Sequence, residues 1–203
     1  MKIKWVPNIL TTIRILLVPI FLYYLFADLN HGKLFALFIF IIASITDALD
    51  GIIARKHNFI TKFGTFFDPL ADKFLVLSAF YAFMFTDLTA NIEYGKTIYL
   101  IMIILISFRD IFVTLLRTIM QYRGITMITS GLGKLKTILQ FLTINIILIF
   151  LILRSYQILS PAYTYNLSLY LLMIITTSVT FYTGVHYFYY NFRILENLFF
   201  HKS

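Results

Sequence analysis

The chain has 203 residues and no cysteine; 60% of its residues are hydrophobic and only 13% are charged. This composition excludes disulfides, thiolate metal sites and an ordinary soluble domain, which carries about 25% charged residues, and it favours one integral membrane domain covering 1–203. The net charge of +8 could suggest nucleic acid, but the basic residues flank apolar segments, so we expect them to contact anionic lipid and expect no nucleic-acid partner.

Six apolar segments are long enough to cross a bilayer, since about 20 helical residues span its ~30 Å hydrocarbon core. In chain order they cover 9–27, 34–55, 68–86, 97–121, 134–154 and 167–190. Backbone in lipid must satisfy its own hydrogen bonds, so each segment predicts a helix. Pro19 lies inside the first segment, and Pro69 lies at the start of the third, where proline is tolerated. The predicted fold class is an all-α membrane bundle of six transmembrane helices.

Lysine and arginine are unevenly distributed between the two ends of these segments. With the N-terminus in the cytoplasm, 14 of the 17 Lys and Arg residues fall on the cytoplasmic side, and only Lys33, Lys96 and Arg154 fall on the other. Cytoplasmic loops carry an excess of positive charge, so both termini are predicted to be cytoplasmic. We therefore expect a multi-pass protein of the cell membrane that retains its first segment as a span.

Four aspartates lie in one short stretch that reads Asp47-x2-Asp50-Gly51-x2-Ala54-Arg55-x8-Gly64-x3-Asp68-x3-Asp72. The spacings of three and four residues place each pair of aspartates on one helix face. Asp47 lies 13 residues after Leu34, where its segment begins, and Asp72 lies 13 residues before Phe85, near the end of the next segment, so both should lie about 20 Å from the outer boundary. The four carboxylates are thus predicted at a common depth, in a cavity that opens to the cytoplasm.

Four ionised carboxylates repel one another in a low-dielectric pocket unless cations compensate them. Arg55 can offset one charge, whereas two divalent cations can offset all four. Oxygen ligands suit Mg²⁺, Mn²⁺ or Ca²⁺ rather than zinc, and a carboxylate-held metal pair serves attack at phosphorus in many enzymes. The alternatives are ion pairs with lysines across helix interfaces, a packing role for Gly51, and a cation or proton transporter, because intramembrane acids also mark ion paths.

The whole pattern resembles the signature of the CDP-alcohol phosphatidyltransferases, with every fixed position met. The resemblance implies a six-helix membrane bundle, commonly a homodimer, with a site at the cytoplasmic side. It implies transfer of a substituted phosphate from a CDP-linked alcohol to a hydroxyl acceptor, with release of CMP. The implied ligands of two Mg²⁺ or Mn²⁺ ions are Asp47, Asp50, Asp68 and Asp72, and Asp72 is also the implied general base. The implied CDP-binding residues are Asn8, Thr11, Asp50, Gly51, Ala54, Arg55, Gly64 and Asp68.

Three further stretches resemble bacterial phosphatidylglycerophosphate synthases within that family. They cover 7–14, 109–117 and 130–137, with Gln140 shortly after the last. The resemblance implies CDP-diacylglycerol and glycerol 3-phosphate as substrates. These synthases commonly carry Arg-Glu where this chain has Arg109-Asp110, so the acid keeps its charge but reaches less far. Inositol phosphate, serine or another alcohol remains an alternative acceptor, whereas membrane prenyltransferases space their acidic clusters differently, in two separate loops.

A phosphorylated acceptor requires a cationic pocket, and the chain offers candidates for one. The candidate acceptor-phosphate ligands are Arg109, Arg117, Ser130, Lys134 and Lys136. Arg109 and Arg117 are eight residues apart, near enough to one helix face to converge, and arginine matches phosphate oxygens bidentately. Asp110 is expected to pair with Arg117. For both lysines, the alternative is an ordinary charge at the cytoplasmic boundary.

Overall fold

The computed structural model describes residues 6–57, 62–86, 93–122, 124–125, 131–158 and 163–200. Within the helices, the side chains left outside the described set are those of 6–11, 47–57, 62–72, 122, 163–165, 193, 195 and 197–200. The described residues form six helices: α1 (Val6–Phe26), α2 (Gly32–His57), α3 (Lys62–Phe83), α4 (Gly95–Tyr122), α5 (Leu132–Ser155) and α6 (Tyr163–Phe200). The predicted all-helical class and the order of the six helices are confirmed.

Most helix ends differ from the ends of the apolar segments that predicted them, and every helix begins earlier than its segment. The largest differences are that α3 begins at Lys62 rather than 68 and that α6 runs on to Phe200 rather than 190. Pro69 therefore lies within α3, not at its start, which corrects that expectation. The physical reason is that hydropathy marks only the part of a helix that needs an apolar environment, while the backbone continues the helix into more polar sequence.

Three helices are long and apolar enough in their described residues to cross a membrane. These stretches are Gly95–Gln121, Leu132–Ser155 and Asn166–Phe192. The other three helices contribute shorter apolar stretches, Thr12–Phe26, Gly32–Thr46 and Lys73–Phe83. Many large apolar side chains also face outward, Phe108 among them with 67% of its surface exposed. Such extensive exposed apolar surface is typical of a protein that lies in a bilayer.

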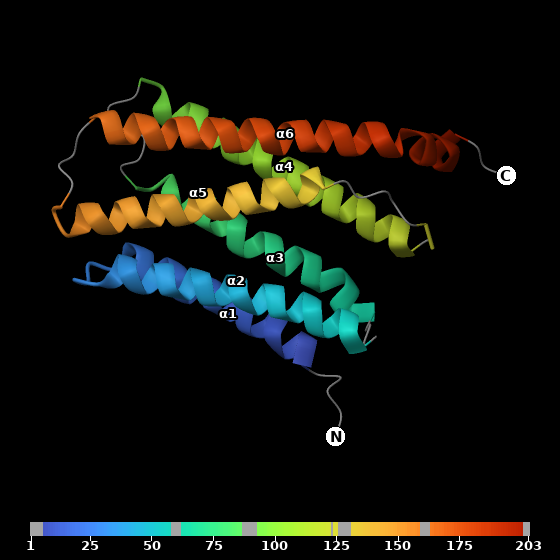
Figure 1. Cartoon of the computed structure of the whole chain (residues 1–203), viewed down its shortest axis with the longest axis horizontal. Helices are drawn as coiled ribbons and strands as arrows, with labels where there is room; N and C mark the ends of the chain where they lie inside the picture. The colour runs from blue at the N-terminus through green and yellow to red at the C-terminus, as the bar shows by residue number, and fades with distance from the viewer. Residues whose placement is uncertain are drawn as a thin grey trace.

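Successive helices alternate in direction, so the bundle has two distinct ends (Figure 1). We call the end at which α1 begins and α6 ends the first end; α2 and α4 also end there, and α3 and α5 begin there. α1 packs against α2 and α3, and α6 packs against α4 and α5. Contacts of α3 with α4, and of α5 with α2 and α3, join these two groups of three helices. The start of α1 and the end of α6 therefore lie at the same end of the bundle.

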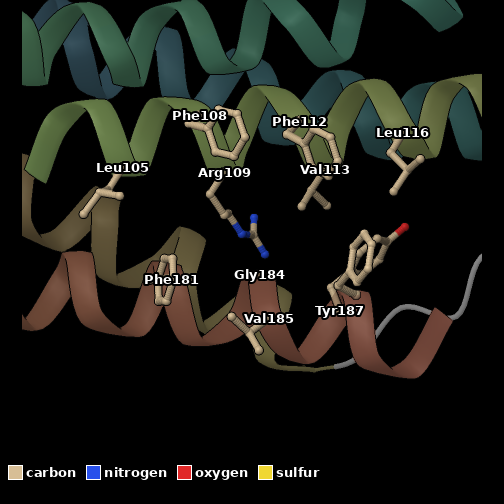
Figure 2. Close-up of a pocket in the computed structure, with 11 residues that line it drawn as sticks. Leu105, Phe108, Arg109, Phe112, Val113, Leu116, Phe181, Gly184, Val185 and Tyr187 are labelled. Carbon is tan, nitrogen blue, oxygen red and sulfur yellow. The ribbon is translucent and has the colours of Figure 1, made fainter. Parts of the chain in front are cut away.

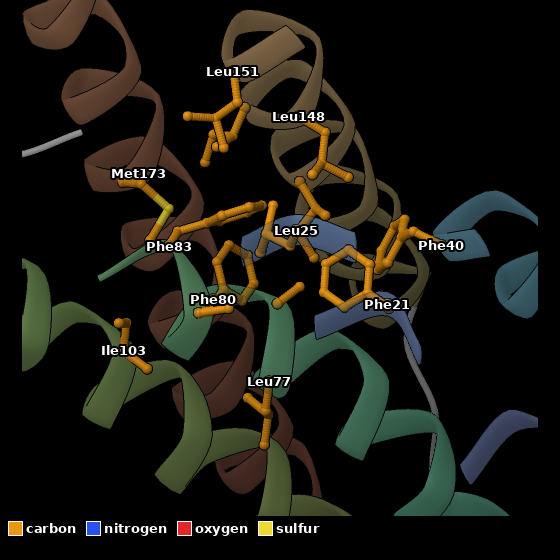
Figure 3. Close-up of a cluster of buried hydrophobic side chains, with 14 of the residues drawn as sticks. Phe21, Leu25, Phe40, Leu77, Phe80, Phe83, Ile103, Leu148, Leu151 and Met173 are labelled. Atoms are coloured by element: carbon orange, nitrogen blue, oxygen red, sulfur yellow. The ribbon is translucent and has the colours of Figure 1, made fainter. Parts of the chain in front are cut away.

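The main hydrophobic core lies toward the end of the bundle opposite the first end, and it contains side chains from all six helices (Figure 3). The ring of Phe40 on α2 packs against both α1 and α5. Its centroid lies 5.8 Å from that of Phe21 on α1 and 5.6 Å from that of Phe141 on α5. On α3, Phe80 and Phe83 are fully buried in the same cluster. Aromatic pairs at these separations add packing energy of about 0.5–1.5 kcal/mol each. The apolar core thus fixes the helices at one end and leaves the polar residues for the other.

Candidate functional site

The aspartate pairs lie toward the first end of the bundle, on two helices that run in opposite directions. Asp47 and Asp50 belong to the second half of α2, and Asp68 and Asp72 belong to the first half of α3. Their side chains lie outside the described residues, so their predicted role as metal ligands stays a prediction. The side chains of Asn8, Thr11, Ala54 and Arg55, the surroundings of Gly51 and Gly64, and the whole of Ser130 also lie outside the described residues. Their predicted roles in binding CDP or the acceptor phosphate therefore stay predictions.

Asp110 of α4 is the centre of a buried polar cluster in the described part of the chain. Its side chain has 0% exposure. Oδ1 accepts a hydrogen bond from Arg109 Nη1 at 3.1 Å and another from Lys136 Nζ of α5. Oδ2 accepts from Gln140 Nε2 at 3.1 Å. Both carboxylate oxygens are therefore satisfied, as a buried charge requires.

Neighbouring helices extend this cluster. Lys136 Nζ also donates to Gln140 Oε1 at 3.3 Å, and Gln140 Nε2 lies 3.5 Å from Thr180 Oγ1 on α6. Lys73, which follows Asp72 on α3, is close enough to interact electrostatically with both Asp110 and Lys136. The cluster therefore links four helices, α3 to α6. Among the described residues it holds three cations against one carboxylate, and this excess of positive charge favours an anionic ligand.

The structure brings together two of the five candidate phosphate ligands, Arg109 and Lys136, whose side chains are 11% and 4% exposed. Arg117 and Lys134 are exposed, so Lys134 has the location of an ordinary boundary charge. The expected pair between Asp110 and Arg117 is wrong. Seven residues along a helix are about 10 Å of rise, which exceeds the reach of an aspartate, whereas α5 presents Lys136 directly opposite Asp110.

Sequence reasoning missed the polar face of α6. Thr176, Thr180 and Thr183 are all buried there, and Thr176 Oγ1 lies 2.7 Å from the hydroxyl of Thr143 on α5. Their spacing of four and three residues places these threonines on one helix face, which was the available signal. Arg14 of α1 is also fully buried. It ends the stretch 7–14 that resembles the synthases, but no role was predicted for it.

Arg109 also borders an apolar groove of about 180 Å³ between α4 and α6. Figure 2 shows its guanidinium directed from α4 toward Gly184 of α6, between apolar side chains of both helices. Tyr187 lies farther along the same groove and is within electrostatic range of both Arg109 and Arg117. The buried cluster and the groove thus meet at Arg109.

Comparison with known proteins identifies the family of the chain. The family model for CDP-alcohol phosphatidyltransferase matches residues 4–183. A Rickettsia typhi protein named CDP-diacylglycerol–glycerol-3-phosphate 3-phosphatidyltransferase is 34% identical over 146 residues, which are 72% of this chain and 77% of that protein. A Bacillus subtilis protein of the same name is 36% identical over 155 residues, 70% of this chain and 76% of that protein. A probable phosphatidylglycerophosphate synthase of Mycobacterium tuberculosis is 36% identical over 148 residues, 71% of this chain and 66% of that protein. The chain therefore belongs to the CDP-alcohol phosphatidyltransferase family.

Proposed function

We propose that the protein transfers the phosphatidyl group of CDP-diacylglycerol to the hydroxyl of glycerol 3-phosphate, giving phosphatidylglycerol phosphate and CMP. The names of relatives at 34–36% identity support this reaction within the family. The observation that carries it in the structure is the buried cluster of Arg109, Asp110 and Lys136, with its excess of positive charge. A phosphorylated acceptor needs such a pocket, whereas free inositol or serine does not.

The donor set of the acidic stretch fits two Mg²⁺ or Mn²⁺ ions, since all four side chains are carboxylates and these are the ligands such ions prefer. Asp47, Asp50, Asp68 and Asp72 would hold the ions, which when bound neutralise charge on the diphosphate. Arg55 would contact the diphosphate as well.

The chemistry requires one proton transfer and one displacement at phosphorus. Asp72 takes the proton from the acceptor hydroxyl of glycerol 3-phosphate, while Arg109 and Lys136 hold the acceptor's phosphate. The hydroxyl oxygen forms a bond to the phosphorus that bears diacylglycerol. The bond from that phosphorus to the oxygen of CMP breaks, and CMP leaves with the electron pair.

In the cell membrane, the first end of the bundle faces the cytoplasm in this proposal. Fourteen of the 17 Lys and Arg residues support that orientation. CDP-diacylglycerol then reaches the aspartates from the inner leaflet, and glycerol 3-phosphate reaches Arg109 from the aqueous side. The family resemblance supports a homodimer as the assembly.

The acceptor is tested by measuring CMP release from CDP-diacylglycerol by the purified protein with one acceptor at a time. Glycerol 3-phosphate should give the fastest release. Glycerol, inositol and serine should be at least about tenfold slower, because each lost charge-assisted hydrogen bond to phosphate costs about 1.5–3 kcal/mol. Faster release with an unphosphorylated alcohol would contradict the proposed acceptor. Cation uptake into liposomes that lack any CDP-lipid would favour a transporter instead.

A further inference from the structure

Gly184 of α6 lies directly against the stem of Arg109 where α4 and α6 pack together (Figure 2). A Cβ atom placed on Gly184 would lie 2.8 Å from Cγ of Arg109, 3.3 Å from its Nε and 3.6 Å from its Cδ. Real Cβ atoms essentially never approach a non-bonded heavy atom of another part of the protein within 3.0 Å. The stem of Arg109 therefore occupies the space that any side chain at 184 would need.

A glycine at this position lowers the stability of α6, so its presence needs a structural reason. Glycine in the interior of a helix is less favourable than alanine by about 1 kcal/mol, and Gly184 lies in the interior of α6. Among the described glycines, a Cβ placed on Gly32 would also lie 2.8 Å from another atom, but that atom is the backbone oxygen of Tyr24, whereas a Cβ placed on Gly133 of α5 would meet nothing within 4 Å. The atoms around Gly184 that would clash belong to Arg109, so the reason for this glycine lies in that side chain.

The guanidinium of Arg109 is also held by its neighbour on α4, Asp110. Its Nη1 donates to Asp110 Oδ1, and Lys136 and Gln140 hold Asp110 in turn. Its buried Nε has no hydrogen-bond partner among the described residues. The Arg109 side chain thus contacts both α6 and Asp110, which gives its guanidinium a defined position. Its remaining N–H donors can bind an anion.

We propose that Gly184 is a positioning residue for the acceptor: by lacking a side chain it sets the location of the Arg109 guanidinium that binds the acceptor's phosphate. This rests on the proposed function, in which Arg109 contacts the phosphate of glycerol 3-phosphate. A methyl group at 184 pushes the Arg109 stem away from α6 and moves its donors off the phosphate. A misplacement of about 1 Å is enough to lower activity as much as a hundredfold.

The test is a double-mutant cycle with kinetics for both substrates. Gly184→Ala should raise the KM for glycerol 3-phosphate by about tenfold or more, with the KM for CDP-diacylglycerol unchanged. Gly133→Ala, which adds the same methyl group in open space, should match the wild type. In an Arg109→Ala background the three contacted atoms are gone, so Gly184→Ala should add no further change in KM.

Each other outcome is decisive. The proposal is overturned if Gly184→Ala resembles Gly133→Ala, if it raises both KM values equally, or if its effect persists without Arg109. Loss of folded Gly184→Ala protein would overturn it too, because the glycine would then serve packing alone. Glycerol 3-phosphate turnover with an unchanged KM in Arg109→Ala would sink this inference and leave the proposed function standing. If the wild type uses a different acceptor, the proposed function fails, and the same cycle with that acceptor still tests Gly184.

Discussion

Replacing Asp72 by Asn is expected to lower kcat for CMP release by about 10²–10⁴-fold, the range that a positioned general base contributes. An amide cannot take the proton of the acceptor hydroxyl, and it brings no negative charge to a divalent cation. The substitution keeps the size of the side chain, so α3 should fold unchanged. Single-turnover release of CMP from CDP-diacylglycerol measures the effect.

The matched control is Asp28→Asn, the same chemical change at an exposed residue in the connection between α1 and α2. This variant should release CMP at the wild-type rate. Release at that rate by purified, folded Asp72→Asn would refute the role of Asp72 as general base.

Replacing Lys136 by Met is expected to destabilise the folded protein by about 3 kcal/mol, because it removes one partner from a buried ion pair. Asp110 keeps its hydrogen bonds from Arg109 and Gln140, so the effect should lie near the lower limit for such changes. In detergent, this corresponds to a fall in Tm of about 6–12 °C for a chain of this size. Methionine fills nearly the same volume, so lost packing contributes little.

Lys134 provides the control, because it lies two residues away on the same helix but is exposed. Lys134→Met should change stability by no more than about 0.5 kcal/mol. Equal falls in Tm for the two lysine variants would mean that the ion pair with Asp110 does not stabilise the bundle.

Much of the fold could be predicted from hydropathy, because each helix contains an apolar run that lipid forces into helical backbone. The helix ends could not be predicted in the same way. The segment from Lys62 up to Asp68 precedes the apolar run that predicted the third helix, yet it forms the first turns of α3. Its helical state depends on continuation of the backbone hydrogen bonds, which hydropathy does not report.

Residues of the site could be predicted only where the sequence of a single helix distinguishes them. Arg109 lies near the middle of the apolar segment 97–121, which is too deep for a boundary charge, and the structure places it in the buried cluster. Lys134 and Lys136 look alike in sequence, and only the rotation of α5 buries one and exposes the other. The pairing of Asp110 with Lys136 depends on how α4 packs against α5, which no local pattern specifies.

The most direct measurement is anomalous diffraction at the manganese edge, from crystals grown with Mn²⁺ and a cytidine nucleotide. Two manganese peaks should lie between α2 and α3, each bound by carboxylates from the set Asp47, Asp50, Asp68 and Asp72, with the nucleotide's phosphates beside them. Full nucleotide density with no manganese at these four side chains, or carboxylates that face separate parts of the bundle, would contradict the metal-assisted transfer on which the proposed function depends.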